Sequence, residues 1–207
     1  LYKKLLFGNY SFIGPDSLSP QAIKQGIEMA NEKNGEYPLW IPWIFSGLPS
    51  IHSFQNISNF YLPHHIYVFL NHFFGVSFIW NYIFHFIFGG IGCVLLLKRL
   101  EVDDLSATFG GISFILTPYL ITMIVHGHGS QMMTAMYIPW IIWAINRIKN
   151  DLKIYNIGIL AFFIGLQLQR AHVQIAYYTW MLAGLYILLL FFYQFSNTYK
   201  RLQSIKI

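Results

Sequence analysis

Apolar residues run in long blocks through the later part of the chain, whereas polar residues collect in the first quarter and at the borders between blocks. The hydrocarbon core of a bilayer, about 30 Å thick, needs roughly 17 to 25 apolar residues in one helix. Five blocks approach or meet this length, and each is expected to cross a membrane: 76–97, 105–125, 132–148, 152–168 and 173–195. The pattern predicts an all-α fold, a polytopic integral membrane helical bundle.

Residues 1–75 are more polar than the rest, and we expect them to form a large external loop that carries short interfacial helices, with 76–207 forming a five-span bundle. The aromatic and histidine-rich stretch 60–74 is too short and polar to span, so it predicts an interfacial or re-entrant helix. The chain begins with Leu1 and not with Met, and residues 2–7 resemble the end of a longer segment. We therefore expect the chain to be a piece of a longer protein.

A short amphipathic helix is predicted in the external loop. Ser19 followed by Pro20 is typical of a helix start, because serine caps the free N–H groups and proline suits the first helical position. Ile23 and Ile27 then recur at helical spacing on one face, and Gly35 predicts the end. After this helix, three prolines prevent another long helix, and Trp and Phe residues are typical of a membrane–water interface.

Composition supports a membrane environment, because 56% of the residues are hydrophobic, 10% are charged and the mean hydropathy is +0.48. The net charge of +5 does not indicate a nucleic-acid partner, since the basic residues flank the apolar blocks instead of gathering on one face. The single cysteine, Cys93, excludes a disulfide within the chain. The lipid bilayer is the first predicted partner.

Basic residues also predict the topology. The connections expected on the cytoplasmic side carry Lys98, Arg99, Arg147, Lys149, Lys153, Lys200, Arg201 and Lys206. The opposite connections, 126–131 and 169–172, carry only Arg170. The positive-inside rule therefore places residues 1–75 outside the cell.

Histidines show the opposite asymmetry. Seven of the eight fall on the predicted external side or at the outer ends of spans: His52, His64, His65, His72, His126, His128 and His172. Only His85 lies in the middle of a span. Two interpretations stand side by side, namely a polar chamber open to the outside or histidines that are simply tolerated in interfacial loops.

The loop His126-Gly127-His128-Gly129-Ser130-Gln131 is the sharpest polar turn between two spans. Its glycines allow close approach of a ligand, and His126, His128 and Gln131 could hold a phosphate or a sugar. A metal is the alternative, but two imidazoles lack a third ligand in sequence, so no metal and no other cofactor is predicted. A plain tight turn is the third interpretation.

Two further positions are candidates for chemistry. Arg170 is a lone cation beside His172, and a guanidinium can bind phosphate in bidentate fashion or merely reach a lipid headgroup. Asp16, in Gly14-Pro15-Asp16-Ser17, either forms a turn or acts as a general base.

The block Tyr37-Pro38-Leu39-Trp40-Ile41-Pro42-Trp43-Ile44-Phe45-Ser46-Gly47-Leu48-Pro49 resembles the external "P-x-W-N-P-y-x-f-s-G-x-P" block of the YfhO family of bacterial membrane proteins, with Ile41 where the pattern has asparagine. The resemblance extends over 107–119, Gly127-His128 and Ile138-Pro139-Trp140, and it implies a further span before Leu1. This family is similar to the GT-C class of glycosyltransferases.

The resemblance implies an enzyme of the bacterial plasma (inner) membrane that transfers a sugar from a polyprenyl-phosphate donor to a cell-envelope glycan or lipid acceptor on the external face. Asp16 is then the catalytic base, and His126, His128, Gln131, Arg170, His172, Trp40 and Trp43 are expected to contact substrate. A non-catalytic transporter or flippase for lipid-linked sugars remains the alternative. A structural membrane subunit is the third possibility.

Overall fold

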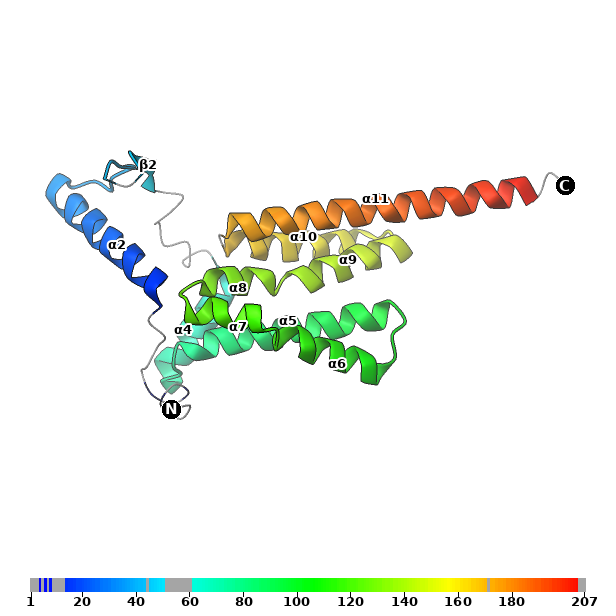
Figure 1. The fold of residues 1–207 in the computed structure, drawn as a ribbon, viewed down its shortest axis with the longest axis horizontal. Helices are drawn as coiled ribbons and strands as arrows, with labels where there is room; N and C mark the ends of the chain where they lie inside the picture. The colour runs from blue at the N-terminus through cyan, green and yellow to red at the C-terminus, as the bar shows by residue number, and fades with distance from the viewer. Residues whose placement is uncertain are drawn as a thin grey trace. The chain divides into compact units, whose positions relative to one another are not determined.

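The computed structural model describes residues 4, 6, 8, 14–43, 45–50, 61–170 and 172–204, and these are mostly helical (Figure 1). In chain order the elements are α2 (Pro15–Asn34), β1 (Trp40–Ile41), β2 (Leu48–Pro49), α4 (Leu62–Phe74), α5 (Ile79–Arg99), α6 (Asp104–Ile115), α7 (Pro118–Val125), α8 (Gly129–Ala135), α9 (Ile138–Asn150), α10 (Ile154–Gln169) and α11 (Val173–Ser204). They form two compact units. The first comprises the described residues of Leu1–Phe86 with Ile115–Met133, and the second comprises those of Ile87–Phe114 with Thr134–Ile207.

In the first unit, α2 begins at Pro15 and not at Pro20, so the predicted start was wrong. Proline is favourable at the first position wherever the preceding residue is extended, and Gly14 meets that condition with φ −78° and ψ 154°. The predicted end is confirmed. Gly35 takes the left-handed conformation, with φ 72°, and its N–H donates to the Asn31 carbonyl oxygen at 2.8 Å.

The Trp/Pro block forms a small hairpin beside α2. Its two strands pair antiparallel with Trp40 opposite Pro49 and Ile41 opposite Leu48. Ile41 is fully buried, and the backbone N–H of Ser50 donates to the Leu39 carbonyl oxygen at 3.0 Å. The apolar face predicted for α2 is confirmed, because Ile27 is buried.

The predicted helix over 60–74 is confirmed as α4 from Leu62 onward, while residue 60 lies outside the described residues. α4 ends at Gly75, which is left-handed with φ 62°. The interfacial location of α4 stays a prediction. The division into an external part, 1–75, and a membrane part, 76–207, stays a prediction as well.

Three helical segments among the described residues, not five, are long and apolar enough to cross a membrane: Ile79–Arg99, Asp104–Val125 and Val173–Gln194.

The block 132–148 is divided between α8 and α9. Pro139 lies in the first turn of α9, and because proline cannot continue a preceding helix it favours a new start there. α9 has 13 residues and α10 has 16, so at 1.5 Å per residue they are about 20 and 24 Å long. The expectation that each of the five blocks forms one span-length helix was therefore wrong for blocks 132–148 and 152–168.

The second unit packs α9, α10 and α11 side by side (Figure 1). An aromatic cluster fills part of its core. The indole N–H of Trp140 donates to the Phe88 carbonyl oxygen at 2.9 Å, and its ring lies 4.9 Å from the rings of both Phe88 and Phe163. Polar side chains join the helices as well, since the Tyr186 hydroxyl donates to Asn146 Oδ1 at 2.8 Å.

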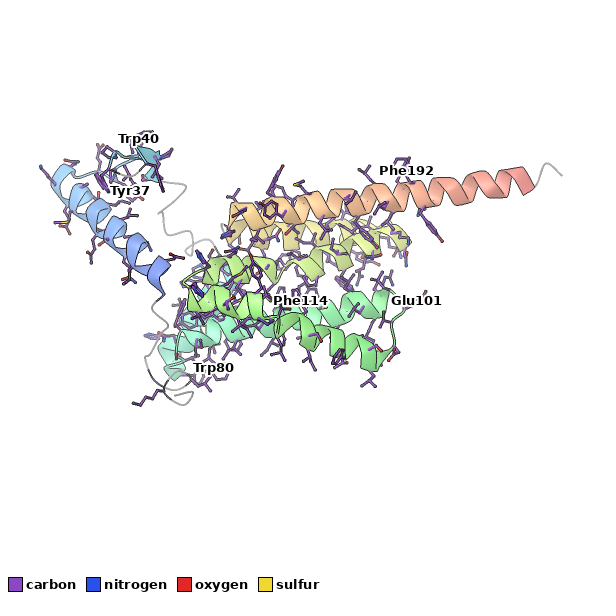
Figure 2. All side chains as sticks on the ribbon, viewed as in Figure 1. Tyr37, Trp40, Trp80, Glu101, Phe114 and Phe192 are labelled. Carbon is purple, nitrogen blue, oxygen red and sulfur yellow. The ribbon has the colours of Figure 1, made fainter. Side chains whose placement is uncertain are left out.

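Basic residues gather at one end of this unit. The α5–α6 connection, which contains Glu101, and the α9–α10 connection lie at the same end, and the α10–α11 corner with Arg170 lies at the other (Figures 1 and 2). At the α9–α10 connection Lys153 Nζ lies 3.0 Å from Asp151 Oδ2. This contact, with a hydrogen bond from the Tyr155 hydroxyl, holds the pKa of the Asp151 carboxyl below its usual range.

Two helical glycines of the second unit provide a matched test of this core. A methyl group at Gly92 would lie 2.5 Å from the indole nitrogen of Trp140, whereas one at Gly184 would meet no atom within 4 Å. Gly92→Ala should therefore destabilise the purified protein by about 1–3 kcal/mol through overpacking. Gly184→Ala should leave it unchanged or up to about 1 kcal/mol more stable, because alanine favours helix. Thermal unfolding in detergent measures both, and equal effects would contradict the packing at Trp140.

Candidate functional site

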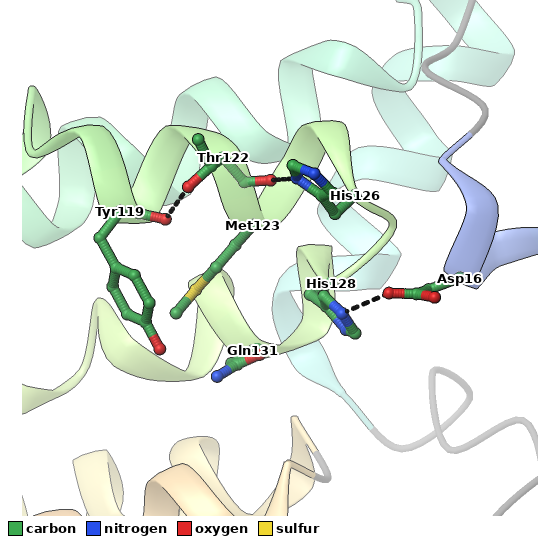
Figure 3. A pocket seen from close by; sticks show the side chains of 7 residues that line it. All are labelled: Asp16, Tyr119, Thr122, Met123, His126, His128 and Gln131. Atoms are coloured by element: carbon green, nitrogen blue, oxygen red, sulfur yellow. Dashed lines mark hydrogen bonds and ion pairs between the residues drawn. The ribbon is translucent and has the colours of Figure 1, made fainter.

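The described residues of the first unit bring one carboxylate and one imidazole together. Asp16 Oδ2 lies 2.9 Å from His128 Nε2, with both side chains about half exposed (Figure 3). Asp16 lies in the first turn of α2, where the free N–H groups of the helix favour a negative charge. His128 comes directly before α8. The pair therefore joins the start of one helix to the start of another, far apart in sequence.

A glycine makes this approach possible. A Cβ atom on Gly14 would lie 2.6 Å from the His126 carbonyl oxygen and 2.7 Å from the Gly127 nitrogen, so no other residue fits without moving backbone. The turn that it meets is tight. The N–H of His128 donates to the Met123 carbonyl oxygen at 2.7 Å, and Gly127 has φ 96°, which favours glycine.

An open hollow of about 420 Å³ lies beside the pair. Its lining comes from the start of α2, from α7 and from the α7–α8 turn into α8: Asp16, Tyr119, Thr122, Met123, His126, His128 and Gln131 (Figure 3). Its volume is within the range of small-ligand sites, about 300–1,000 Å³. The wall combines an aromatic ring, a thioether, an amide and two imidazoles with one carboxylate.

The His126 ring has a defined orientation. Its Nδ1 lies 2.9 Å from the Thr122 carbonyl oxygen, which can only accept, so Nδ1 carries a proton and donates. In the neutral ring Nε2 is then an acceptor. The Thr122 hydroxyl donates within its own helix, to the carbonyl oxygens of Pro118 and Tyr119.

The structure thus places four of the predicted site residues together: Asp16, His126, His128 and Gln131. Trp40 and Trp43 lie in the hairpin of the same unit and do not line the hollow. Arg170 and His172 belong to the second unit. There His172 Nδ1 accepts a long hydrogen bond, 3.4 Å, from the Ile175 N–H in the first turn of α11. Substrate contact by Arg170, His172, Trp40 and Trp43 stays a prediction.

Sequence reasoning missed three residues of the wall, Tyr119, Thr122 and Met123. Thr122 precedes His126 by four residues, a spacing that places two side chains on one helical face. The sequence alone could therefore have predicted Thr122 as a neighbour of His126. Asp16 and His128 supply two groups of the type that ligates metals. Across the described ranges, no cluster of three or more His, Cys, Asp or Glu side chains could hold a metal ion.

Comparisons with known proteins return no match: no protein-family model, no curated protein and no solved structure matches this chain. The geometry of the site is therefore the basis for any functional assignment, and the resemblance to the YfhO family stays a prediction.

Gly14→Ala should separate Asp16 from His128, because the added methyl group collides with backbone that cannot rotate away. The measurement uses Asp16→Cys with His128→Cys in a Cys93→Ser background and a short thiol-specific cross-linker, with the linked peptides quantified by mass spectrometry. Cross-linking should fall several-fold when Gly14→Ala is added.

Gly158→Ala is the control, since its methyl group would meet no atom within 4 Å. Equal cross-linking with Gly14→Ala and with Gly158→Ala would show that the start of α2 does not lie against the α7–α8 turn.

Proposed function

We propose that this protein is a GT-C-like membrane glycosyltransferase, which transfers a sugar from a polyprenyl-phosphate donor to a cell-envelope glycan or lipid acceptor on the external face of a bacterial plasma membrane. The observation that carries the proposal is the contact between Asp16 and His128 at the edge of an open hollow. Such a pair can accept a proton from a hydroxyl group, which is the step that an acceptor sugar or lipid requires.

A membrane location is supported by three helical segments that are long and apolar enough to cross. α9 and α10 pack along the first part of α11, so we include them as shorter crossings, which a bilayer accommodates by local thinning (Figure 1). Basic residues at one end of that unit favour the cytoplasm for that end. With an odd number of crossings, three or five, residues 1–75 lie on the external side in this proposal.

The proposed reaction uses residues of the first unit. The oxygen of the acceptor hydroxyl attacks the anomeric carbon of the donor sugar while the bond from that carbon to the phosphate oxygen breaks. The hydroxyl proton passes to the Asp16 carboxylate, and polyprenyl phosphate leaves as the anion. His128 Nε2–H, donating to Asp16 Oδ2, holds the carboxylate in place, so His128 is a positioning residue.

The hollow supplies groups for the rest of the substrate. The Gln131 amide can donate to a phosphate or sugar oxygen, and Tyr119 presents an aromatic ring at the wall. His126 offers Nε2 as an acceptor when neutral, because its Nδ1 proton is engaged by the Thr122 carbonyl. When protonated, the same ring would donate from Nε2 and place a positive charge near the leaving phosphate, where charge develops in the transition state.

A transporter or flippase for lipid-linked sugars is the second candidate, and one observation favours it. His85, in α5, is buried, with Nε2 2.6 Å from the Tyr61 hydroxyl and Nδ1 2.6 Å from the Asn81 carbonyl oxygen. Ser77 and Asn81, which precede it at intervals of four, are buried too. Polar groups at membrane depth are costly and often line a path for polar substrates.

Sugar transfer from a labelled polyprenyl-phosphate donor, in membranes that contain the full-length protein, tests the proposal. Asp16→Asn should reduce transfer by about 10²- to 10⁴-fold, because it removes the proton acceptor. His128→Gln should reduce it less, since it removes only the group that positions the carboxylate. Glu28→Gln, at an exposed acid on the same helix, is the control and should have no effect.

Transfer by Asp16→Asn at the rate of the unchanged protein would remove Asp16 from the mechanism. If no donor supports transfer by any variant, while vesicles containing the protein move lipid-linked sugar between leaflets, the transporter is correct. Loss of that movement in His85→Ala would then assign the path to the Tyr61 and His85 pair.

A further inference from the structure

The turn of the hairpin has an unusual backbone. Phe45 and Ser46 have φ of 49° and 62°, and Gly47 follows with 116°. Positive φ is expected for glycine, but for a bulky residue such as phenylalanine it is a marked outlier. A strained backbone of this kind persists only where the surrounding structure holds it, and such positions are frequent at functional sites.

The result of this backbone is an exposed aromatic tip. The side chain of Phe45 is 94% exposed, and those of Trp40 and Trp43 are 55% and 54% exposed. We define these three residues as the aromatic tip; Figure 2 shows Trp40 in the hairpin, near Tyr37. The base of the hairpin is held firmly by buried Ile41 and Ser50.

Each tryptophan packs one part of its ring against a glycine and exposes about half of its side chain. The ring of Trp40 covers Gly47, where a Cβ atom would lie 2.7 Å from the indole nitrogen, and the ring of Trp43 lies against Gly26 of α2. In the part of the chain that the structure describes, neither indole N–H has a hydrogen-bond partner. A tryptophan with an apolar body and an unused N–H suits a boundary that is apolar on one side and wet on the other.

Charge narrows the choice of what covers this tip. Residues 37–50 contain no Asp, Glu, Lys, Arg or His, whereas α2 beside them exposes Lys24, Glu28 and Glu32. A protein partner recognised by charge has nothing to contact on the tip, and neither does an anionic headgroup. The same chain carries three segments long and apolar enough to cross a membrane, and a bilayer is therefore the uncharged surface that we expect the tip to meet.

We propose that the aromatic tip inserts into the uncharged glycerol and ester zone of the phospholipid bilayer and anchors the hairpin and α2 at the membrane surface. The indole N–H groups donate to lipid ester oxygens, while Phe45 reaches below them into the upper acyl chains. This assigns Trp40 and Trp43 to lipid instead of to substrate. The proposal rests on the hairpin alone and holds whether the protein is a transferase or a transporter.

Depth measurement with a fluorescent label tests the anchor. Ser46→Cys, in a Cys93→Ser background, carries the label at the tip, and Glu32→Cys on the exposed face of α2 is the matched control. Full-length protein is reconstituted in phosphatidylcholine vesicles that contain a nitroxide either near the glycerol or near the end of the acyl chain. The tip label should be quenched at least about twofold more than the control, and more by the shallow nitroxide than by the deep one.

Adding Phe45→Ser should reduce quenching of the tip label, because the deepest side chain of the anchor is lost. Equal quenching of tip and control would overturn the proposal. A second set of vesicles also contains an anionic phospholipid, and quenching that appears only in this set would overturn the proposal too, since the tip carries no charge. A tip label that is shielded from water but not quenched, and whose shielding grows with protein density in the vesicle, would show that a second copy covers the tip.

Discussion

Gly14 meets the backbone of His126 and Gly127 with no room for a side chain, and the candidate site depends on this single close contact. It fixes the start of α2 against the α7–α8 turn, so that the first-turn carboxylate of Asp16 reaches the imidazole of His128. Both partners are half exposed, so the Coulomb attraction between them is modest. Backbone packing, not charge, therefore determines where the pair forms, and the charge only orients it.

The second unit illustrates how polar groups are accommodated among apolar helices. Gln167 is fully buried and donates from its amide nitrogen to Thr179 Oγ1 at 2.9 Å and to the Thr134 carbonyl oxygen at 3.3 Å. The Thr179 hydroxyl donates its own hydrogen bond to the Ile175 carbonyl oxygen. Where little water competes, such bonds tie helices together. With the Trp140 cluster they form the core of this unit, and the basic residues lie outside this core at one end.

The sequence predicted what depends on local rules. Apolar blocks predicted the helical fold, and Gly35 predicted the end of α2 because a left-handed residue needs no partner elsewhere in the chain to be recognised. Prediction from the sequence failed where two local signals compete. Pro15 and Pro20 are equally suitable at a helix start, and the extended Gly14 favours the first. Pro139 divides the block 132–148, which hydrophobicity alone predicts to be one continuous helix.

The site was predictable in part. The polar turn at 126–131 is visible as a cluster of histidine and glycine, and Asp16 was identified as a lone acid. That the two meet was not visible, because the contact joins segments separated by more than a hundred residues and depends on an absent side chain at Gly14. The left-handed turn at Phe45 was equally hidden, since nothing in the local sequence favours positive φ at a phenylalanine.

The most direct measurement of the central claim is photo-cross-linking with a polyprenyl-phosphate sugar that carries a photoreactive group on its sugar ring, using full-length protein in membranes and mass spectrometry of the labelled peptides. If the hollow beside Asp16 and His128 binds the donor, label should appear on peptides of α7 and α8, around Tyr119 and Gln131, and unlabelled donor should compete for it. Label confined to other peptides, or label in α7 and α8 that unlabelled donor fails to displace, would contradict the assignment of the donor site to this hollow.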